Sequence, residues 1–296
     1  MTALIDFTQP LDAAAPRLRH AFGNPRTVLV AHALDEVRGV LQAVHAAAQR
    51  GSWCVGHVRY EAAAAFDAAL QTHAADGPLA WFAVYDAPQP WPQATEPSDA
   101  AQVRWQAGID RAGFDAAFSC IQQAIAAGEL YQVNHTAPLC GTLHGSPQAL
   151  FEALQRAQPG GYAAHIDTGE EQVLSVSPEL FFDWQDAPGG GRILARPMKG
   201  TAPRGTTPEQ DAAHAEQLRT APKERAENVM IVDLLRNDLS RVALPHSVQV
   251  PALFATQQLP TVWQMTSDVV ARTRPGTTLV DVFTALVPCG SVTGAP

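Results

Sequence analysis

The stretch YAAHIDTGEEQVLSVSPELFFDWQDAPGGGRILARPMKG, residues 162–200, decides the fold class of this sequence. It contains three strand-like runs, rich in β-branched and aromatic residues, which follow one another without a helical segment between them. Successive strands of this kind pair as antiparallel neighbours, whereas parallel strands need a crossover, usually a helix. The stretch therefore favours an α+β fold with antiparallel sheets and helices packed outside, and a doubly wound parallel fold is the second choice.

Similar patterns extend on both sides of this stretch. Apolar residues at helical spacing predict helices over residues 35–51, 111–129, 146–161, 207–238 (with a break near Pro222) and 277–286. Further strands are predicted over residues 53–61, 79–87, 130–141 and 248–274. The Pro-rich segment at 87–102 has no periodicity and is the best candidate for a linker or long loop.

Composition limits the classes of function that the chain can have. It has 296 residues, 46% hydrophobic and 17% charged, enough to bury a core in one large domain or two ordinary ones. The net charge of −9 argues against a nucleic-acid partner, since such proteins usually present a basic face. No secretory signal, membrane-spanning run or C-x-x-C pair is found among the residues. These features indicate a cytoplasmic protein with reduced thiols and no zinc site.

Two glutamates lie near the start of the helix that follows Pro222. Thr220 is expected to cap this helix. Glu224 and Glu227 share one helical face with apolar residues one turn further on. Helix-start glutamates that face water would explain the pattern, and so would carboxylates offered to a hard cation such as Mg²⁺. The residues alone leave both interpretations open.

Glu179 lies between an alternating strand and two phenylalanines, directly after Pro178. Apolar surroundings favour the protonated form of a carboxyl group, which suits a general acid. A carboxylate at the rim of a strand would explain the same sequence.

Lys199 is a single amine at the point where a predicted strand meets Gly200. If the strand stays extended to its end, Lys199 faces opposite to Arg196 and Met198. A lysine is a nucleophile only when it is deprotonated, and an arbitrary lysine is far more often a solvated surface residue. The residues alone therefore favour the surface interpretation.

Several common functional motifs are absent from the sequence. It has no phosphate-binding loop, Rossmann glycine pattern, H-E-x-x-H helix or nucleophile elbow. His57, His135 and His165 lie in strand-like stretches and are expected to be polar residues with satisfied hydrogen bonds rather than metal ligands.

Six stretches, in this order, resemble the chorismate-utilising enzymes: GELYQVN, SVSPELF, RPMKGTAPRG, KERAENVMIVDLLRNDLSRV, VQVPALF and GSVTGAP. That family includes component I of anthranilate synthase and of aminodeoxychorismate synthase, and the isochorismate and salicylate synthases. The resemblance is strong from about residue 108 to residue 296. It implies large antiparallel β-sheets packed as a sandwich with helices outside, residues 1–102 being the variable N-terminal region and 103–296 the chorismate-binding catalytic domain.

Two positions separate the subfamilies that this sequence resembles. The isochorismate and salicylate synthases carry a water-activating lysine where this chain has Gln132, so Gln132 indicates a member that uses ammonia. Anthranilate synthases have alanine where this chain has Lys199, whereas aminodeoxychorismate synthases have the lysine. The sequence is therefore most similar to component I of aminodeoxychorismate synthase, and anthranilate synthase component I is the alternative within the enzyme class.

The resemblance implies a role for each matched residue. Lys199 would attack the chorismate ring, and Glu179 would protonate the ring hydroxyl that leaves. Glu227 would bind Mg²⁺, with Glu224 nearby. Gln132, Gly200, Thr201, Gly290 and Ser291 would contact the substrate. The ammonia would come from a glutamine amidotransferase partner, and the product would serve p-aminobenzoate and folate synthesis.

Two departures from the family pattern bear on function. Many members carry a histidine where this chain has Gln264, which can keep a hydrogen bond but cannot transfer a proton. The sequence also ends within the family's G-S-x-T-G-A-P-K motif, so we expect residues 1–296 to be a C-terminally incomplete piece that is inactive by itself. An inert, chorismate-binding fragment is accordingly the alternative outside the enzyme class.

Overall fold

The strands form five sheets, and every strand pair is antiparallel among the residues that the computed structural model describes, 2–12, 14–92, 101–106 and 108–295. The four-stranded sheet has the order β10 (Gln172–Ser177), β9 (Tyr162–Asp167), β1 (Ala3–Phe7), β2 (Leu18–Phe22). The three-stranded sheet has the order β3 (Thr27–Ala31), β5 (Ala80–Tyr85), β4 (Trp53–Val58).

The largest sheet carries most of the predicted site residues. It has the order β11 (Leu180–Gln185), β12 (Arg192–Arg196), β15 (Val262–Arg272), β13 (Met198–Pro203), and β14 (Gln249–Gln258) also pairs with β15. Two small sheets pair β6 (Gln102–Trp105) with β8 (Gly141–His144) and β7 (Gln132–Val133) with β16 (Gly294–Ala295).

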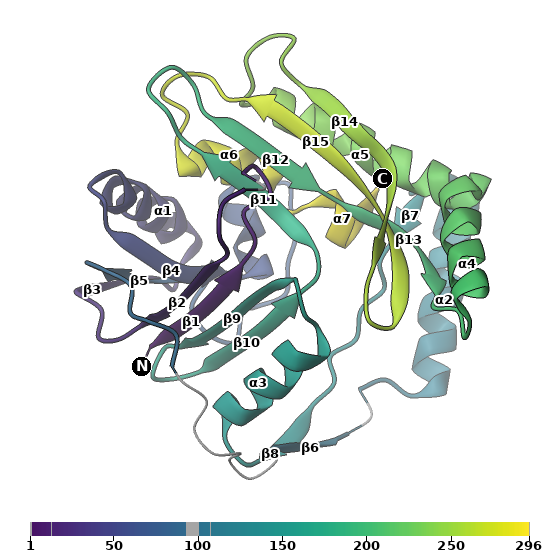
Figure 1. Ribbon diagram of the computed structural model, residues 1–296, viewed down its shortest axis with the longest axis horizontal. Coiled ribbons are helices and arrows are strands. Elements are labelled where there is room, and N and C mark those ends of the chain that lie inside the picture. The colour runs from purple at the N-terminus through teal and green to yellow at the C-terminus, as the bar shows by residue number, and fades with distance from the viewer. Residues whose placement is uncertain (1, 13, 93–100, 107, 296) are drawn as a thin grey trace.

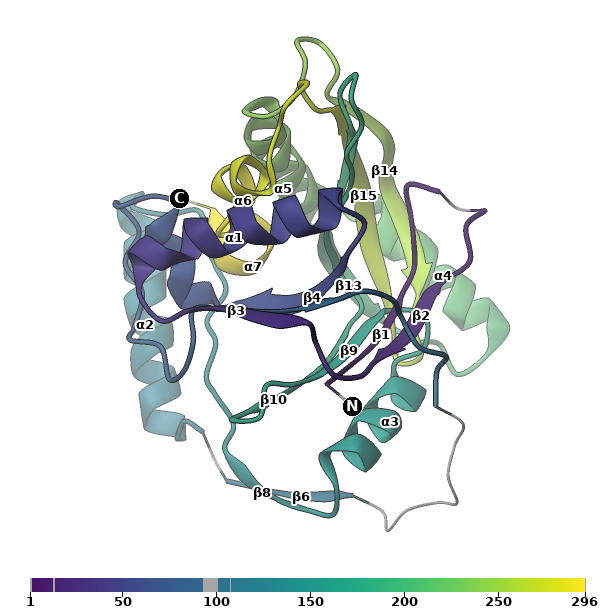
Figure 2. The ribbon, with the colours of Figure 1, turned by 90° about the vertical axis from the view of Figure 1, so that its left-hand side faces the viewer.

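Helices pack against these sheets, except α2, none of whose residues is buried (Figure 1). They are α1 (Leu34–Gln49), η1 (Tyr60–Ala65), α2 (Arg111–Ala127), α3 (Pro147–Ala157), α4 (Pro208–Thr220), α5 (Pro222–Ser240), α6 (Leu279–Leu286) and α7 (Gly290–Thr293). Figure 2 shows α1 above the three-stranded sheet, the four-stranded sheet beneath it, and α3 on the far side. The predicted α+β fold with antiparallel sheets and outer helices is confirmed.

Hydrophobic side chains fill the spaces between these layers. One core joins α5 and α6 to β12 and β15, with Ile231, Leu235 and Val269 almost fully buried. A second core lies between α1 and β5, and a third lies between the three-stranded and four-stranded sheets. Phe151 of α3 fills a smaller core on the other face of the four-stranded sheet. The apolar stripes that predicted these helices therefore face the sheets, as the hydrophobic effect requires.

Most of the expected helix ends are confirmed by their caps. Ser146 accepts a hydrogen bond from Ala149 N at 3.1 Å at the start of α3, and Gly128 ends α2 in the left-handed conformation. The expected cap at Thr220 is wrong. Thr220 is the last residue of α4 and its hydroxyl donates to Glu216 O at 2.8 Å, so Ala221 begins α5 without a side-chain cap.

Two expected elements differ in extent. Within the strand predicted over residues 130–141, only Gln132 and Val133 belong to β7, which pairs with β16. The second of the three strand-like runs in residues 162–200, QVLSVSPELFFDW (172–184), divides into β10 and β11 on either side of a turn. Residues 93–100 of the expected linker lie outside the described residues, and the boundary at residue 102 stays a prediction. The four-stranded sheet draws its strands from both sides of that boundary.

Helix α2 presents its apolar stripe to the surface. None of its residues is buried, and the side chains of Phe114, Phe118 and Ile125 are 43–49% exposed. In the part of the chain that the structure describes, no helix combines the length and apolarity that crossing a membrane requires.

The packing of α5 on the largest sheet can be tested with two leucines. Leu235 is 1% exposed in the α5–sheet core, whereas Leu253 of β14 is 46% exposed. Replacing Leu235 with alanine removes buried apolar surface and leaves a cavity, so the free energy of unfolding should fall by about 2–5 kcal/mol in urea denaturation. Leu253→Ala is the matched control, and equal losses in the two variants would contradict this core.

Candidate active site

Lys199 and Gly200 form a β-bulge in β13. Met198 pairs with Thr266 and Thr201 with Gln264, so two residues of β13 lie opposite the single residue between those partners on β15. Gly200 has a φ of 98°, which favours glycine. A bulge breaks the alternation of an extended strand and turns a side chain in a new direction. The expected alternation of Lys199 against Arg196 and Met198 therefore does not continue through a regular strand.

The buried amide of Asn228 binds the backbone of the bulge. Asn228 of α5 has no exposed surface, and its Nδ2 donates to Lys199 O at 3.3 Å. Its Oδ1 accepts from Ser267 Oγ at 2.6 Å, and that hydroxyl accepts from Phe254 N at 3.1 Å. Such a fully satisfied buried network makes the position of the Lys199 backbone specific. The sequence analysis did not single out Asn228. Because Asn228 and Ile231 are three residues apart, they share one helical face, and an amide on a buried face indicates a specific hydrogen bond.

The Lys199 amine points toward β7. Its Nζ donates to Asn134 Oδ1 at 3.4 Å, and Gln132 Nε2 donates to the same oxygen at 3.2 Å. Asn134 Nδ2 in turn donates to the carbonyl oxygens of Ser291 and Val292. Three predicted site residues (Lys199, Gln132 and Ser291) are thus joined through Asn134, which sequence reasoning missed.

Glu179 lies in the turn between β10 and β11, directly beside the bulge. Its Oε1 accepts hydrogen bonds from Met198 N at 3.0 Å and from Ser291 Oγ. Ser177 Oγ shapes the turn by accepting from Glu179 N and donating to Glu179 O. The predicted acid is therefore held next to the residue that precedes the predicted nucleophile.

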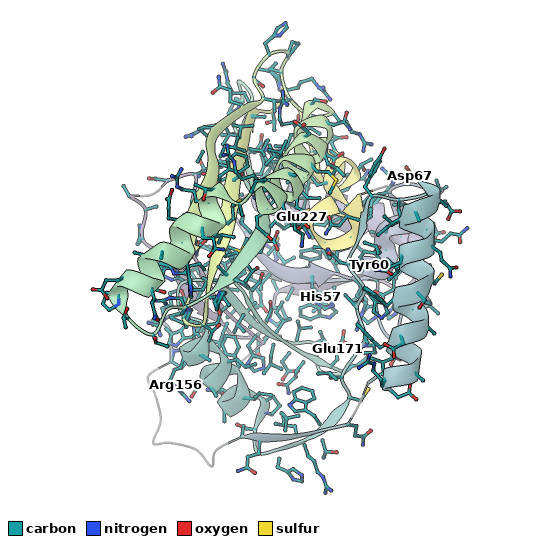
Figure 3. All side chains as sticks on the ribbon, turned by 90° about the vertical axis from the view of Figure 1, so that its right-hand side faces the viewer. His57, Tyr60, Asp67, Arg156, Glu171 and Glu227 are labelled. Atoms are coloured by element: carbon teal, nitrogen blue, oxygen red, sulfur yellow. The ribbon has the colours of Figure 1, made fainter. Side chains whose placement is uncertain are left out.

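Glu224 and Glu227 lie on the first two turns of α5. A Cβ atom at Gly200 would come within 3.1 Å of Glu224 Oε2, so only glycine lets the bulge approach this carboxylate. Glu227 is 36% exposed and its Oε1 lies 3.9 Å from Lys223 Nζ. Figure 3 shows Glu227 on α5. Mg²⁺ keeps waters and binds few protein ligands, so these two carboxylates are the groups that could hold it. No group of three His, Cys, Asp or Glu gathers among the described residues.

The other predicted contacts are more peripheral. Thr201 is exposed, and its Oγ1 donates to Gln264 Oε1 at 2.9 Å, so the glutamine at the unusual position serves as an acceptor. Gly290 begins α7, where a Cβ atom would lie 2.6 Å from Leu234 Cδ2. Gly290 therefore lets α7 approach α5, and with it places Ser291 beside Glu179.

Comparison with known proteins shows the family of this chain. The chorismate binding enzyme family matches residues 10–296. The chain belongs to this family. It is 42% identical over 192 residues to aminodeoxychorismate synthase component 1 of Klebsiella aerogenes, covering 65% of this chain and 42% of the relative. It is 38% identical over 186 residues to anthranilate synthase component 1 of Aeropyrum pernix, covering 63% of this chain and 42% of the relative. The chain thus spans less than half the length of these relatives.

Solved structures of chorismate binding enzymes have the same fold. Anthranilate synthase component I from Streptococcus pneumoniae superimposes with a TM-score of 0.77 at 20% identity, covering 100% of this chain and 74% of that structure. An isochorismate synthase from Bacillus anthracis, DhbC, gives 0.73 at 17% identity, covering 98% and 73%. At these identities the likeness concerns the fold alone.

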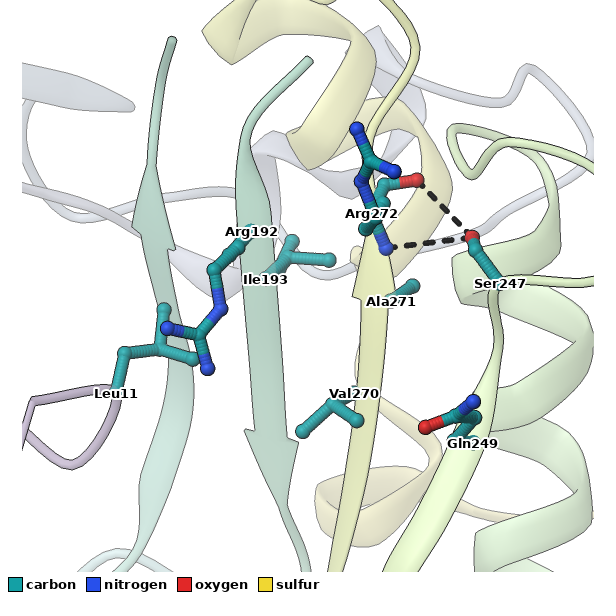
Figure 4. Close-up of a pocket in the computed structure, with 8 residues that line it drawn as sticks. All are labelled: Leu11, Arg192, Ile193, Ser247, Gln249, Val270, Ala271 and Arg272. Carbon is teal, nitrogen blue, oxygen red and sulfur yellow. Dashed lines mark hydrogen bonds between the residues drawn. The ribbon is translucent and has the colours of Figure 1, made fainter.

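Two cavities on the largest sheet differ in their relation to the site. The one in Figure 4, of about 300 Å³, is lined by Arg192, Arg272 and Ser247 among others and includes no predicted site residue. Another, of about 410 Å³, is lined by Glu179 together with the aromatic residues Phe181 and Trp184. The Glu179 turn therefore separates an apolar space from the hydrogen-bonded group around Lys199.

Cys289 is a second potential nucleophile close to Glu179 and Ser291. Burial raises the pKa of the Cys289 thiol to about 11. A thiol is nucleophilic as the thiolate, so Cys289 stays protonated and unreactive near neutral pH.

The reactivity of Cys289 can be compared with that of two exposed thiols. At about pH 8, iodoacetamide should modify Cys120 and Cys140, which are exposed, well before Cys289, because their thiolates form more readily. Peptide mass spectrometry would measure the rates, and Cys289 should react at the rate of the others once urea unfolds the chain. Rapid modification of Cys289 in the folded protein would contradict its burial as a protonated thiol.

Proposed function

We propose that the protein is component I of an aminodeoxychorismate synthase, which makes 4-amino-4-deoxychorismate from chorismate and ammonia. The observation that carries this proposal is the placement of Lys199 on a bulge whose neighbours include Glu179, Gln132 and Ser291. The chain has only one other lysine, Lys223, whose side chain is 80% exposed on α5. Lys199 also distinguishes this subfamily from the anthranilate synthases that the chain resembles.

The first step forms a bond between Lys199 Nζ and the ring carbon next to the carboxylate-bearing carbon of chorismate. The electron pairs of the ring shift, and the bond to the ring hydroxyl breaks. Glu179 supplies the proton with which this hydroxyl leaves as water. Glu179 Oε2 has no hydrogen bond among the described residues, so this oxygen can hold the proton while Oε1 is bound by Met198 N and Ser291 Oγ.

In the second step ammonia attacks the carbon that lost the hydroxyl. The ring electrons shift back, the bond to Lys199 breaks, and the amine is regenerated. Covalent catalysis thus divides one difficult substitution into two easier ones. Gln132 Oε1 is buried without a hydrogen-bond partner among the described residues, and a ligand with N–H groups such as ammonia would satisfy it.

Glu227 and Glu224 would hold Mg²⁺ at the start of α5. When bound, the ion neutralises the carboxylate of the substrate ring. The relatives' designation as component 1 supports a second component, and we propose a glutamine amidotransferase that supplies the ammonia. We expect residues 1–296 alone to have little activity, which the exposed apolar face of α2 supports.

The proposed nucleophile is tested with the full protein as its gene encodes it. With chorismate and Mg²⁺ but no ammonium, mass spectrometry should find the substrate, less one water, on the Lys199 peptide. Lys199→Ala should abolish this adduct and lower product formation at least about 100-fold, because the covalent route is lost. Lys223→Ala is the matched control.

The product identifies the reaction. With ammonium present, chromatography should show aminodeoxychorismate. Anthranilate as the main product would instead support the anthranilate synthase assignment. No turnover by the full protein would support an inert chorismate-binding protein.

The metal position is tested by binding rather than by activity. Glu227→Gln removes a charged oxygen ligand, so the Mg²⁺ dissociation constant in calorimetry should rise by about 10- to 100-fold. Glu216→Gln, on exposed α4 surface where Glu216 pairs with Arg219, is the control and should leave binding unchanged. Unaltered binding in Glu227→Gln would remove Glu227 from the metal site.

A further inference from the structure

We propose that Asn134 is a positioning residue for Lys199. Its amide orients the Lys199 amine and gives that amine a neutral hydrogen-bond acceptor in place of a carboxylate. The inference rests on the proposed role of Lys199 as the nucleophile. It adds Asn134, which directly follows β7, to the site.

The hydrogen bonds of Asn134 determine which end of its amide faces Lys199. Nδ2 donates to Ser291 O at 3.1 Å and to Val292 O at 2.6 Å. Oδ1 accepts from Gln132 Nε2 at 3.2 Å and from Lys199 Nζ at 3.4 Å. An amide has two N–H donors and one oxygen with two lone pairs, and all of them are used here. Rotating the amide would set its NH₂ group against two donors and its oxygen against two carbonyls.

The backbone around Asn134 makes this acceptor rigid. Val133 and Gln132 pair with Gly294 and Ala295 in the β7–β16 ladder, and Asn134 N donates to Thr293 O at 3.3 Å. The amine is therefore held at one end by this strand pair. At the other end, Asn228 holds Lys199 O. A side chain fixed at both ends loses little further freedom when the substrate arrives, which lowers the barrier to attack.

The acceptor of the Lys199 amine, Asn134 Oδ1, is uncharged, and this affects whether the amine can act as a nucleophile. The charged groups to consider are Glu179, which accepts from Met198 N, and Glu224, whose carboxylate lies beside Gly200. Glu227 follows three residues further along α5, where it lies near Lys223. Among the described residues none of these carboxylates forms a hydrogen bond or ion pair with Lys199. A carboxylate in contact would stabilise the ammonium form, which has no lone pair for attack. The amide accepts a hydrogen bond from the neutral amine as well, and leaves its lone pair free.

The contact is tested by placing a charge at position 134. Asn134→Asp is compared with the wild type by trace labelling with an amine-reactive reagent from about pH 6 to about pH 11, with peptide mass spectrometry as the readout. The pH of half-maximal labelling at Lys199 should rise by about one unit or more. Lys223 in the same samples is the internal reference and should not move. Asn24→Asp adds the same charge at an exposed position and should shift neither lysine.

A midpoint for Lys199 that stays at its wild-type value in folded Asn134→Asp would overturn the proposal. Thermal unfolding shows whether that variant is folded. If it is not, Asn134→Ser carries the test, since serine is small and uncharged. There the rate of adduct formation with chorismate should fall at least about tenfold with KM nearly unchanged, as expected for lost orientation. An unchanged rate would overturn the proposal equally.

The same measurements separate this inference from the proposed function. If the wild type forms no adduct with chorismate, the nucleophilic role of Lys199 fails, while the labelling shift still shows whether Asn134 contacts the amine. If the wild type forms the adduct but Asn134→Asp shifts nothing, only the positioning role of Asn134 fails.

Discussion

A two-residue bulge in the middle of a β-sheet is the constraint on which the arrangement of this site depends. Lys199 and Gly200 occupy the length of one residue on β15, and the left-handed conformation of Gly200 makes this possible. The ladder cannot satisfy the Lys199 carbonyl in the usual way, and Asn228 supplies its donor. A regular strand in place of the bulge would send the Lys199 side chain along the sheet's normal alternation and away from Asn134.

Helix α5 connects this bulge to the stability of the whole molecule. One face packs Ile231, Leu235 and Leu239 into the largest core. The same face, in the first two turns of the helix, carries Glu224 and Glu227, and the carboxylate of Glu224 lies beside Gly200 of the bulge. Asn228 lies between these glutamates and the apolar residues along the helix, and it is completely buried. Because the apolar face is anchored in the core, the polar groups of the first two turns keep their places relative to the sheet.

The predicted and observed elements differ where their boundaries depend on contacts between residues far apart in the sequence. Helices whose apolar stripe is buried, such as α1 and α3, were predicted well, because burial of one face is encoded at every third or fourth residue. The stripe of α2 predicted that helix too, but not that its apolar face would be exposed. Thr220 looked like a cap from its neighbours, but the preceding helix continues through it. Within the strand expected at 130–141, Gln132 and Val133 pair with Ala295 and Gly294, more than 150 residues away in the sequence, and no local pattern reveals this pairing.

By itself, the order of the residues determined the fold class, most helix ends and the candidate chemistry, since periodicity, caps and short motifs are local properties. Lys199 and Glu179 could be singled out in this way, but not the contacts that make them a site. Only the tertiary structure brought Asn134 to the Lys199 amine, Asn228 to its carbonyl and Ser291 to Glu179. These pairs lie between 29 and 112 residues apart in the chain, so packing of the sheets and α5, rather than any local preference, decides their proximity.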